Sequence, residues 1–423
     1  NIIKNKNIKV CKQEKSIYQT RRLFLLNSIG DNIIKNKNIK VCKQEKSIYR
    51  TRRFSQVAEK LGWSIAGYSL AFEVSGALGI IALATTMVLA ATLASGVLFH
   101  FDISLQPILI RRALIWRAIS FTMMLLGGYY SSLWLVLGGG FTSGIFVGTF
   151  WPAYYKIQRI CQIDFSKWNL RDKLAGALIV GVSGILVESL GVEIVLLLSL
   201  VSIIISAEYS KVLTVDKGRE QIFTNTSEYS LRIFSSNPSL IAMAEGAFNW
   251  MTNLTRLLVL ITGLLQVVNL PAAVGLGLLL AITQAIGAGV TCGVKEWKGG
   301  SKKLDYKLLI LGLSISLFSS ILLVHKSTWL AGMILLSVGT AIIFPLLKDE
   351  VDQKLDGIGT GGRGLREYSR NIGRTIGSLI IASIWVTIPE LYALALPIII
   401  SVIIITYLCI YSMRNISIKL YRY

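Results

Sequence analysis

The stretch GWSIAGYSLAFEVSGALGIIALATTMVLAATLASGVLFHF at 62–101 decides the fold. It contains one acid, Glu73, and no Lys or Arg. About 20 apolar residues span a bilayer core, and a single helix over this stretch would be about 60 Å long, twice the thickness needed. Ser75, Gly76 and Gly79 permit a tight turn between two crossings. The stretch therefore predicts a helical hairpin within a membrane.

Similar apolar segments recur along the rest of the chain. Hydrophobic residues make up 53 % and charged residues 16 % of the sequence, whereas soluble domains carry about 25 % charged residues. The composition excludes a soluble protein and predicts an all-α membrane protein with twelve transmembrane helices. The predicted helices are 62–79, 81–101, 112–130, 132–153, 173–190, 192–213, 238–266, 270–293, 306–325, 328–347, 371–389 and 391–413.

The distribution of basic residues tests this arrangement, because short cytoplasmic loops are enriched in Lys and Arg. With twelve crossings and the N-terminus in the cytoplasm, 40 of the 44 basic residues lie on that side. Arg117, Arg256 and Arg374 lie within helices, and Lys326 lies in an outer loop. A single helix over 62–101 would place the basic N-terminal segment opposite every later basic loop. The charges therefore favour the hairpin and two cytoplasmic termini.

The longest polar connection divides the chain into two halves. We expect a basic cytoplasmic tail at 1–61, a six-helix bundle at 62–213, a central loop at 214–237, a second bundle at 238–413 and a short tail at 414–423. Within the first tail, residues 1–18 recur unchanged at 32–49. Two copies are too few for a solenoid. The repeat is interpreted as a recent duplication, or as a polybasic segment that lies on anionic lipid.

Glycine-containing motifs indicate a family. The loop GVKEWKGGSKK at 293–303 and the weaker series of Gly96, Asp102 and Arg111-Arg112 resemble the two conserved loops of the major facilitator superfamily. The ridge of Gly140, Gly144, Gly148 and Pro152 is similar to that family's fourth helix, and we interpret its glycines as sites of close helix packing. The resemblance implies a two-bundle secondary transporter that works by alternating access. The proline motif of the family's antiporters is missing from 173–190.

The predicted seventh helix carries a polar stripe. Glu245, Asn249, Asn253 and Arg256 follow one another at spacings of 4, 4 and 3, so they share one helical face. Because charged groups in a membrane are costly, this face must meet protein or water. In the resembled family this helix lines the central cavity, which implies a substrate or proton pathway. A buried structural network is the alternative.

Three further residues are candidates for the pathway. Tyr68 and Glu73 lie in the predicted first helix, and Gln284 lies in the eighth. Glu73 and Glu245 are hypothetical proton carriers, because burial brings a carboxyl group toward neutral titration. Glu73 could instead lie near the outer mouth, and Gln284 could be a simple helix–helix contact.

A basic segment at the start of the eleventh helix is a candidate inner gate. Arg366, Arg370 and Arg374 share one face, and Glu367 can pair with Arg370. We expect these arginines to meet acids of the opposite bundle when the cytoplasmic side closes, with ordinary positive-inside anchoring as the alternative. Glu296 and Lys298, in the later loop motif, are assigned to the gate with them.

The sequence therefore predicts a secondary transporter of a small solute, with proton coupling as a hypothesis. The alternative is a non-transporting protein of the same fold that serves as a structural or assembly partner. The two histidines and the missing phosphate-binding loop speak against an enzyme, a metal site or a cofactor. We expect a monomer in the plasma membrane, without nucleic acid.

Overall fold

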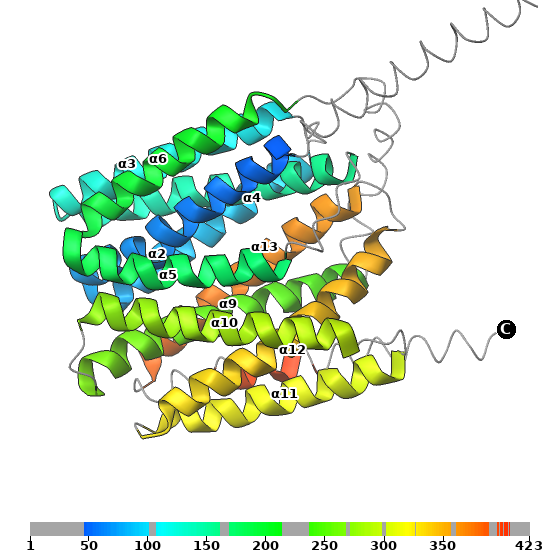
Figure 1. The fold of residues 1–423 in the computed structure, drawn as a ribbon. Helices are drawn as coiled ribbons and strands as arrows, with labels where there is room; N and C mark the ends of the chain where they lie inside the picture. Colours follow the sequence, from blue (N-terminus) through cyan, green and yellow to red (C-terminus); the bar gives the residue numbers. More distant parts are fainter. Residues whose placement is uncertain are drawn as a thin grey trace, which may run out of the picture.

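The computed structural model describes residues 46–100, 107–160, 169–213, 237–267, 271–297, 302–325, 327–356 and 361–388, together with parts of 396–406. The described residues form helices joined by short turns, and no strand occurs among them. The helices lie in two groups, α2 to α6 and α9 to α13 (Figure 1). The all-α prediction is confirmed.

In the described part of the chain the N-terminal group contains six helical rods, and the first two are the arms of one run from residue 46 to His100. Residues 46–58 are helical and continue into a π-helix, η1 (Glu59–Gly67), and then into α2 (Tyr68–His100). The other four are α3 (Pro107–Tyr129), α4 (Leu133–Ile160), α5 (Asn169–Leu190) and α6 (Val192–Ser210).

The predicted hairpin lies inside α2. Ser75 and Gly76 depart from helical geometry, and Gly76 has φ +62°, which favours glycine. A Cβ atom on Gly79 would lie 2.1 Å from the carbonyl oxygen of Ala71. Eight residues of straight helix would separate these positions by about 12 Å. The chain therefore reverses at Ser75–Gly76, and its two arms pack together.

The C-terminal group repeats the pattern. It contains α9 (Asn237–Val267), α10 (Ala272–Trp297), α11 (Lys302–Val324), α12 (Trp329–Asp356) and α13 (Gly361–Thr387). The described residues within 396–406 are helical, and most of the predicted twelfth helix lies outside the described residues.

Several helices extend beyond their predicted apolar windows. The first rod is helical from Lys46, inside the segment predicted as tail, and α12 continues to Asp356. The hydropathy pattern detects only the part of a helix that matches the hydrocarbon core, whereas the helix itself continues into charged sequence. The repeat at 1–18, most of its second copy, the central loop and the C-terminal tail lie outside the described residues.

Seven helical runs among the described residues are long and apolar enough to cross a membrane. One run, Lys46–Phe99, includes both arms of the hairpin. The chain is a multi-pass integral membrane protein. The number of twelve crossings and the sidedness of the termini remain predictions.

The two groups meet along two seams. In one seam α2 packs on α13, where Thr85 Oγ1 lies 2.7 Å from Ser378 Oγ and Thr92 Oγ1 lies 2.9 Å from Thr375 Oγ1. In the other seam α5 packs on α10, and these two helices run side by side in Figure 1. We call the end that carries Gly76 and Gly191 the short-loop end.

The α5–α10 seam is tightest toward the short-loop end. A Cβ atom on Gly184 would lie 2.4 Å from the carbonyl oxygen of Ala273 and 2.9 Å from Cα of Gly277. We call the opposite end, which carries Arg53, Lys173 and Arg366, the basic end. Toward that end both α5 and α10 contribute residues to the wall of a cavity.

Candidate functional site

A cavity of about 760 Å³ lies between the two groups of helices. This volume is within the range of small-molecule sites. Both groups contribute to the wall: the first rod, α3, α4 and α5 on one side, and α9, α10, α12 and α13 on the other. Polar and aromatic side chains of the wall include Arg52, Arg53, Gln56, Glu59, Lys60, Trp63, Ser64, Tyr68, Arg117, Trp151, Tyr155, Asp172, Lys173, Trp250, Asn253, Arg256, Gln284, Phe344, Glu367, Arg370 and Arg374.

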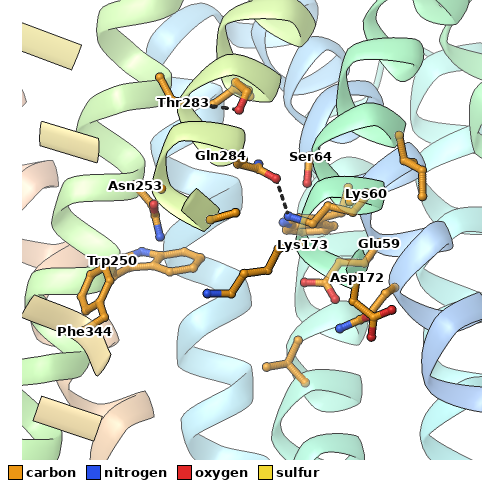
Figure 2. A pocket seen from close by; sticks show the side chains of 18 of the residues that line it. Glu59, Lys60, Ser64, Asp172, Lys173, Trp250, Asn253, Thr283, Gln284 and Phe344 are labelled. Carbon is orange, nitrogen blue, oxygen red and sulfur yellow. Dashed lines mark hydrogen bonds between the residues drawn. The ribbon is translucent and has the colours of Figure 1, made fainter. Parts of the chain in front are cut away.

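The π-helical segment of the first rod faces this cavity. Lys60 Nζ donates a hydrogen bond of 3.2 Å to Gln284 Oε1 of α10, so this contact joins the two groups (Figure 2). Trp63 and Ser64 also line the cavity. At Gly62 the segment packs closely on α3, because a Cβ atom there would lie 2.6 Å from the Phe121 ring. Isolated π-helical turns occur frequently at functional sites.

The predicted stripe on α9 is divided by the structure. Asn253 and Arg256 line the cavity. Asn249 Oδ1 accepts a hydrogen bond of 2.9 Å from Asn253 Nδ2 and so helps to orient the Asn253 side chain. Glu245 is only 1 % exposed and is not among the described residues of the cavity wall. The stripe is therefore a cavity surface at one end and a buried network at the other.

Arg256 is anchored to α12 through neutral groups. Its Nη2 donates to the carbonyl oxygen of Leu336 at 2.9 Å and to Thr340 Oγ1 at 2.5 Å. Its Nη1 donates to Asn253 Oδ1 at 3.4 Å. The guanidinium is held firmly, but no acid balances its charge among the described residues.

Glu245 belongs to an ionic network with α13. Its carboxylate lies 3.3 Å from Arg370 and 3.6 Å from Arg366, and Glu367 lies 3.7 Å from Arg370. These acids belong to the same half as the arginines, whereas acids of the opposite bundle were predicted for the gate. Arg374 Nη1 donates to Asn371 Oδ1 at 2.8 Å. Glu367, Arg370 and Arg374, three of the predicted gate residues, line the cavity.

The remaining predicted residues have different outcomes. Tyr68 and Gln284 line the cavity. Glu73 is exposed beside the hairpin turn at the short-loop end and is not among the described lining residues, because the reversal at Ser75 ends the helix just after it. Glu296 is helical in α10, but its side chain, like Lys298, lies outside what the structure describes.

Several lining residues were not predicted from the sequence. Lys60 was assigned to the cytoplasmic tail, because the apolar window begins after it. Asp172 and Lys173 lie at the start of α5, where charged residues ordinarily mark a membrane boundary. Trp250 could have been predicted as a lining residue from its spacing, since it lies three residues before Asn253 on the same face of α9.

Arg117 occupies an unusual environment in the wall. Its guanidinium carbon lies 4.9–5.4 Å from the ring centroids of Trp63, Phe121 and Phe146. Nη1 donates a hydrogen bond to Ser143 Oγ. The side chain is 1 % exposed. Cation–π contacts stabilise a desolvated guanidinium by about 2 kcal/mol each.

The two bundles, the seams between them and the enclosed cavity define a class: helical membrane proteins with a central solute-sized site. Comparison with solved structures shows the particular fold within this class. The chain superimposes on the nucleoside transporter NupG with a TM-score of 0.60 and 13 % identity, over 88 % of this chain and 98 % of that chain. It therefore has the major facilitator superfamily fold.

Two other transporter structures show the same likeness. The human organic anion transporter MFSD10 (TETRAN) has a TM-score of 0.55 and 12 % identity, over 86 % of this chain and 99 % of that one. A bacterial homologue of the iron transporter ferroportin has a TM-score of 0.57 and 14 % identity, over 86 % and 99 %. No family model and no curated protein matches the sequence.

Proposed function

We propose that this protein is a secondary transporter that moves a small solute across a membrane by alternating access. The observation that carries the proposal is the shared cavity, whose wall comes from both bundles. When the solute contacts both bundles, it can influence how they move relative to each other. The three solved structures compared above are a nucleoside transporter, an organic anion transporter and a bacterial homologue of an iron transporter.

The arrangement of the two seams supports this mechanism. The α5–α10 contact through Gly184 and Gly277 restricts the short-loop end. The cavity wall reaches Arg53 and Lys173 at the basic end. A cavity between two bundles that is restricted at one end along one seam is the arrangement expected for one of the two states between which such a protein alternates.

Uptake into proteoliposomes tests the proposal. The purified full chain is reconstituted and offered a mixture of labelled carboxylates, phosphate esters, nucleosides, amino acids and amines, with protein-free vesicles as the control. We expect saturable accumulation of at least one solute. Asn253→Ala should lower uptake at least several-fold, because it removes a cavity-lining amide. If no solute accumulates above the control, the transporter proposal is wrong.

We place the hypothesis of proton coupling on Glu59 rather than on Glu73 or Glu245. Glu59 lies on η1 and lines the cavity. A carboxyl group must be reachable from the solute pathway to exchange a proton there, which favours Glu59. Uptake under an imposed pH gradient should lose its gradient dependence in Glu59→Gln and retain it in Glu73→Gln. The opposite pattern would restore Glu73 as the carrier.

A further inference from the structure

The cavity wall carries an excess of positive charge. Eight of its residues are Lys or Arg, and three are Asp or Glu. One of these acids, Glu367, already lies 3.7 Å from Arg370. The remaining wall therefore presents more cationic groups than carboxylates to whatever occupies the cavity. In a region shielded from bulk water such an excess attracts anions strongly.

Two of the cations form no close ion pair with an acid among the described residues. Arg256 is bonded to Leu336, Thr340 and Asn253, all neutral. Arg117 is bonded to Ser143 and surrounded by aromatic rings. A cation that is not held in a close ion pair is costly within a membrane protein, and such residues mark functional sites. The two arginines belong to opposite bundles.

Lys60 adds a third cationic group at the cavity surface. Its ammonium group is bonded to the neutral amide of Gln284, and Figure 2 shows this contact on the cavity wall. Lys60 and Arg256 are both partly exposed, whereas Arg117 is covered. Lys60 and Arg256 are therefore placed to touch a ligand, and Arg117 to add positive potential from behind Trp63.

Aromatic groups form much of the remaining surface. Trp151 and Tyr155 contribute from α4, and Trp250 and Phe344 contribute from α9 and α12. Trp250 and Phe344 lie next to each other in Figure 2. Flat apolar surfaces of this kind favour contact with a carbon skeleton. An inorganic anion would fill little of about 760 Å³.

We propose that the cavity binds a small organic anion whose negative group lies between Lys60 and Arg256 and whose carbon body packs on the aromatic residues. This inference rests on the proposed transport function and names its substrate class. Because one cation comes from each bundle, the anion neutralises charge on both sides of the cavity at once.

Binding measurements with charge-matched solutes test the inference. The purified full chain in detergent is titrated with aromatic and aliphatic carboxylates and phosphate monoesters. Each is paired with its uncharged amide or alcohol and with its amine. We expect anions to raise the unfolding temperature and their neutral and cationic counterparts to leave it unchanged. A shift caused by amines or neutral solutes but by no anion would overturn the inference.

Variants locate the site. Arg256→Gln and Lys60→Gln should each weaken binding of the stabilising anion about tenfold or more, because each removes a charged hydrogen-bond donor. Arg256→Lys keeps the charge and should bind more tightly than Arg256→Gln. Lys211→Gln, on an exposed lysine paired with Glu208 outside the cavity wall, should bind like the original protein. Unchanged affinity in both cavity variants would overturn the assignment.

The transport assay separates the two proposals. Accumulation of an amine or a nucleoside, with no anion accumulated, would support the transporter and refute the anion. Accumulation of no solute, together with anion binding that Arg256→Gln abolishes, would refute the transporter while the anion site stands.

Discussion

At the scale of single residues, the ionic network around Glu245 has the largest expected effect on stability. Its carboxylate is buried between Arg366 and Arg370. Removing one partner of a buried ion pair leaves an uncompensated charge, at a cost of about 3–5 kcal/mol. We therefore expect Glu245→Gln to lower the thermal stability of the purified protein markedly, whatever its effect on transport.

A matched control is available at the surface. Glu208 lies 2.7 Å from Lys211, and both side chains are more than half exposed. Exposed pairs contribute about 0–1 kcal/mol, so Glu208→Gln should be nearly neutral. Equal unfolding temperatures for the two variants would show that the Glu245 network does not stabilise the fold.

The sequence could predict part of the site at this scale. The stripe on α9 was predictable because charged groups cannot face lipid. Which of its members face the cavity depends on α13, whose arginines lie more than a hundred residues away and pair with Glu245. Lys60 was missed because hydropathy assigns a lysine to the membrane boundary, whereas the first helix carries it into the cavity wall.

At the scale of elements, the α2–α4 contact depends on glycine. A Cβ atom on Gly144 would lie 2.1 Å from the carbonyl oxygen of Met87, and one on Gly148 would lie 2.4 Å from that of Ala91. The prediction that this ridge serves close packing is confirmed. The backbone atoms that face it leave no room for a methyl group.

We expect Gly144→Ala to destabilise the protein by about 1–3 kcal/mol through overpacking. Gly289→Ala is the matched control, because Gly289 is helical and has no atom within 4 Å of the added methyl position. That change should be neutral or stabilising by about 0.5–1 kcal/mol. Thermal unfolding of both variants checks the pair, and a destabilised Gly289→Ala with an unaffected Gly144→Ala would contradict the packing.

Helix positions were predictable from the sequence, but helix ends were not. The apolar windows located the helices because membrane thickness fixes their length. At the basic end, α12 and α13 continue through charged residues, where hydrogen bonding within the helix persists without an apolar environment. The hairpin was predictable because the sequence has a glycine, Gly76, at the turn, and glycine readily adopts the positive φ that other residues rarely adopt.

At the scale of the whole molecule, alternating access requires α5 and α10 to separate at the short-loop end. A Cβ atom on Gly181 would lie 3.3 Å from Cβ of Ala281, close to the separation that a disulfide requires. In a background with the five native cysteines replaced by serine, Gly181→Cys combined with Ala281→Cys should cross-link on oxidation.

Cross-linking should abolish uptake, because α5 and α10 can no longer part, while solute binding from the basic end persists. Reduction should restore uptake, and neither single-cysteine variant should respond to oxidant. Full uptake by completely cross-linked protein would exclude movement at this seam.

The division into two bundles was predictable from loop length and charge. The sequence could not predict at which end the cavity is restricted, because the two states of an alternating-access protein have the same sequence.

The π-helical turn of the first rod has a consequence for periodicity. Arg52, Gln56, Lys60, Ser64 and Tyr68 all line the cavity at a spacing of four. In a regular α-helix each step of four residues advances by about 400°, so the first and last of them would diverge by about 160°. The wider turns between Glu59 and Gly67 cancel this drift and keep a straight stripe. A cysteine scan of the first rod with a water-soluble thiol reagent should therefore show labelling that repeats every four residues. Neither an α-helix nor a π-helix alone has this period.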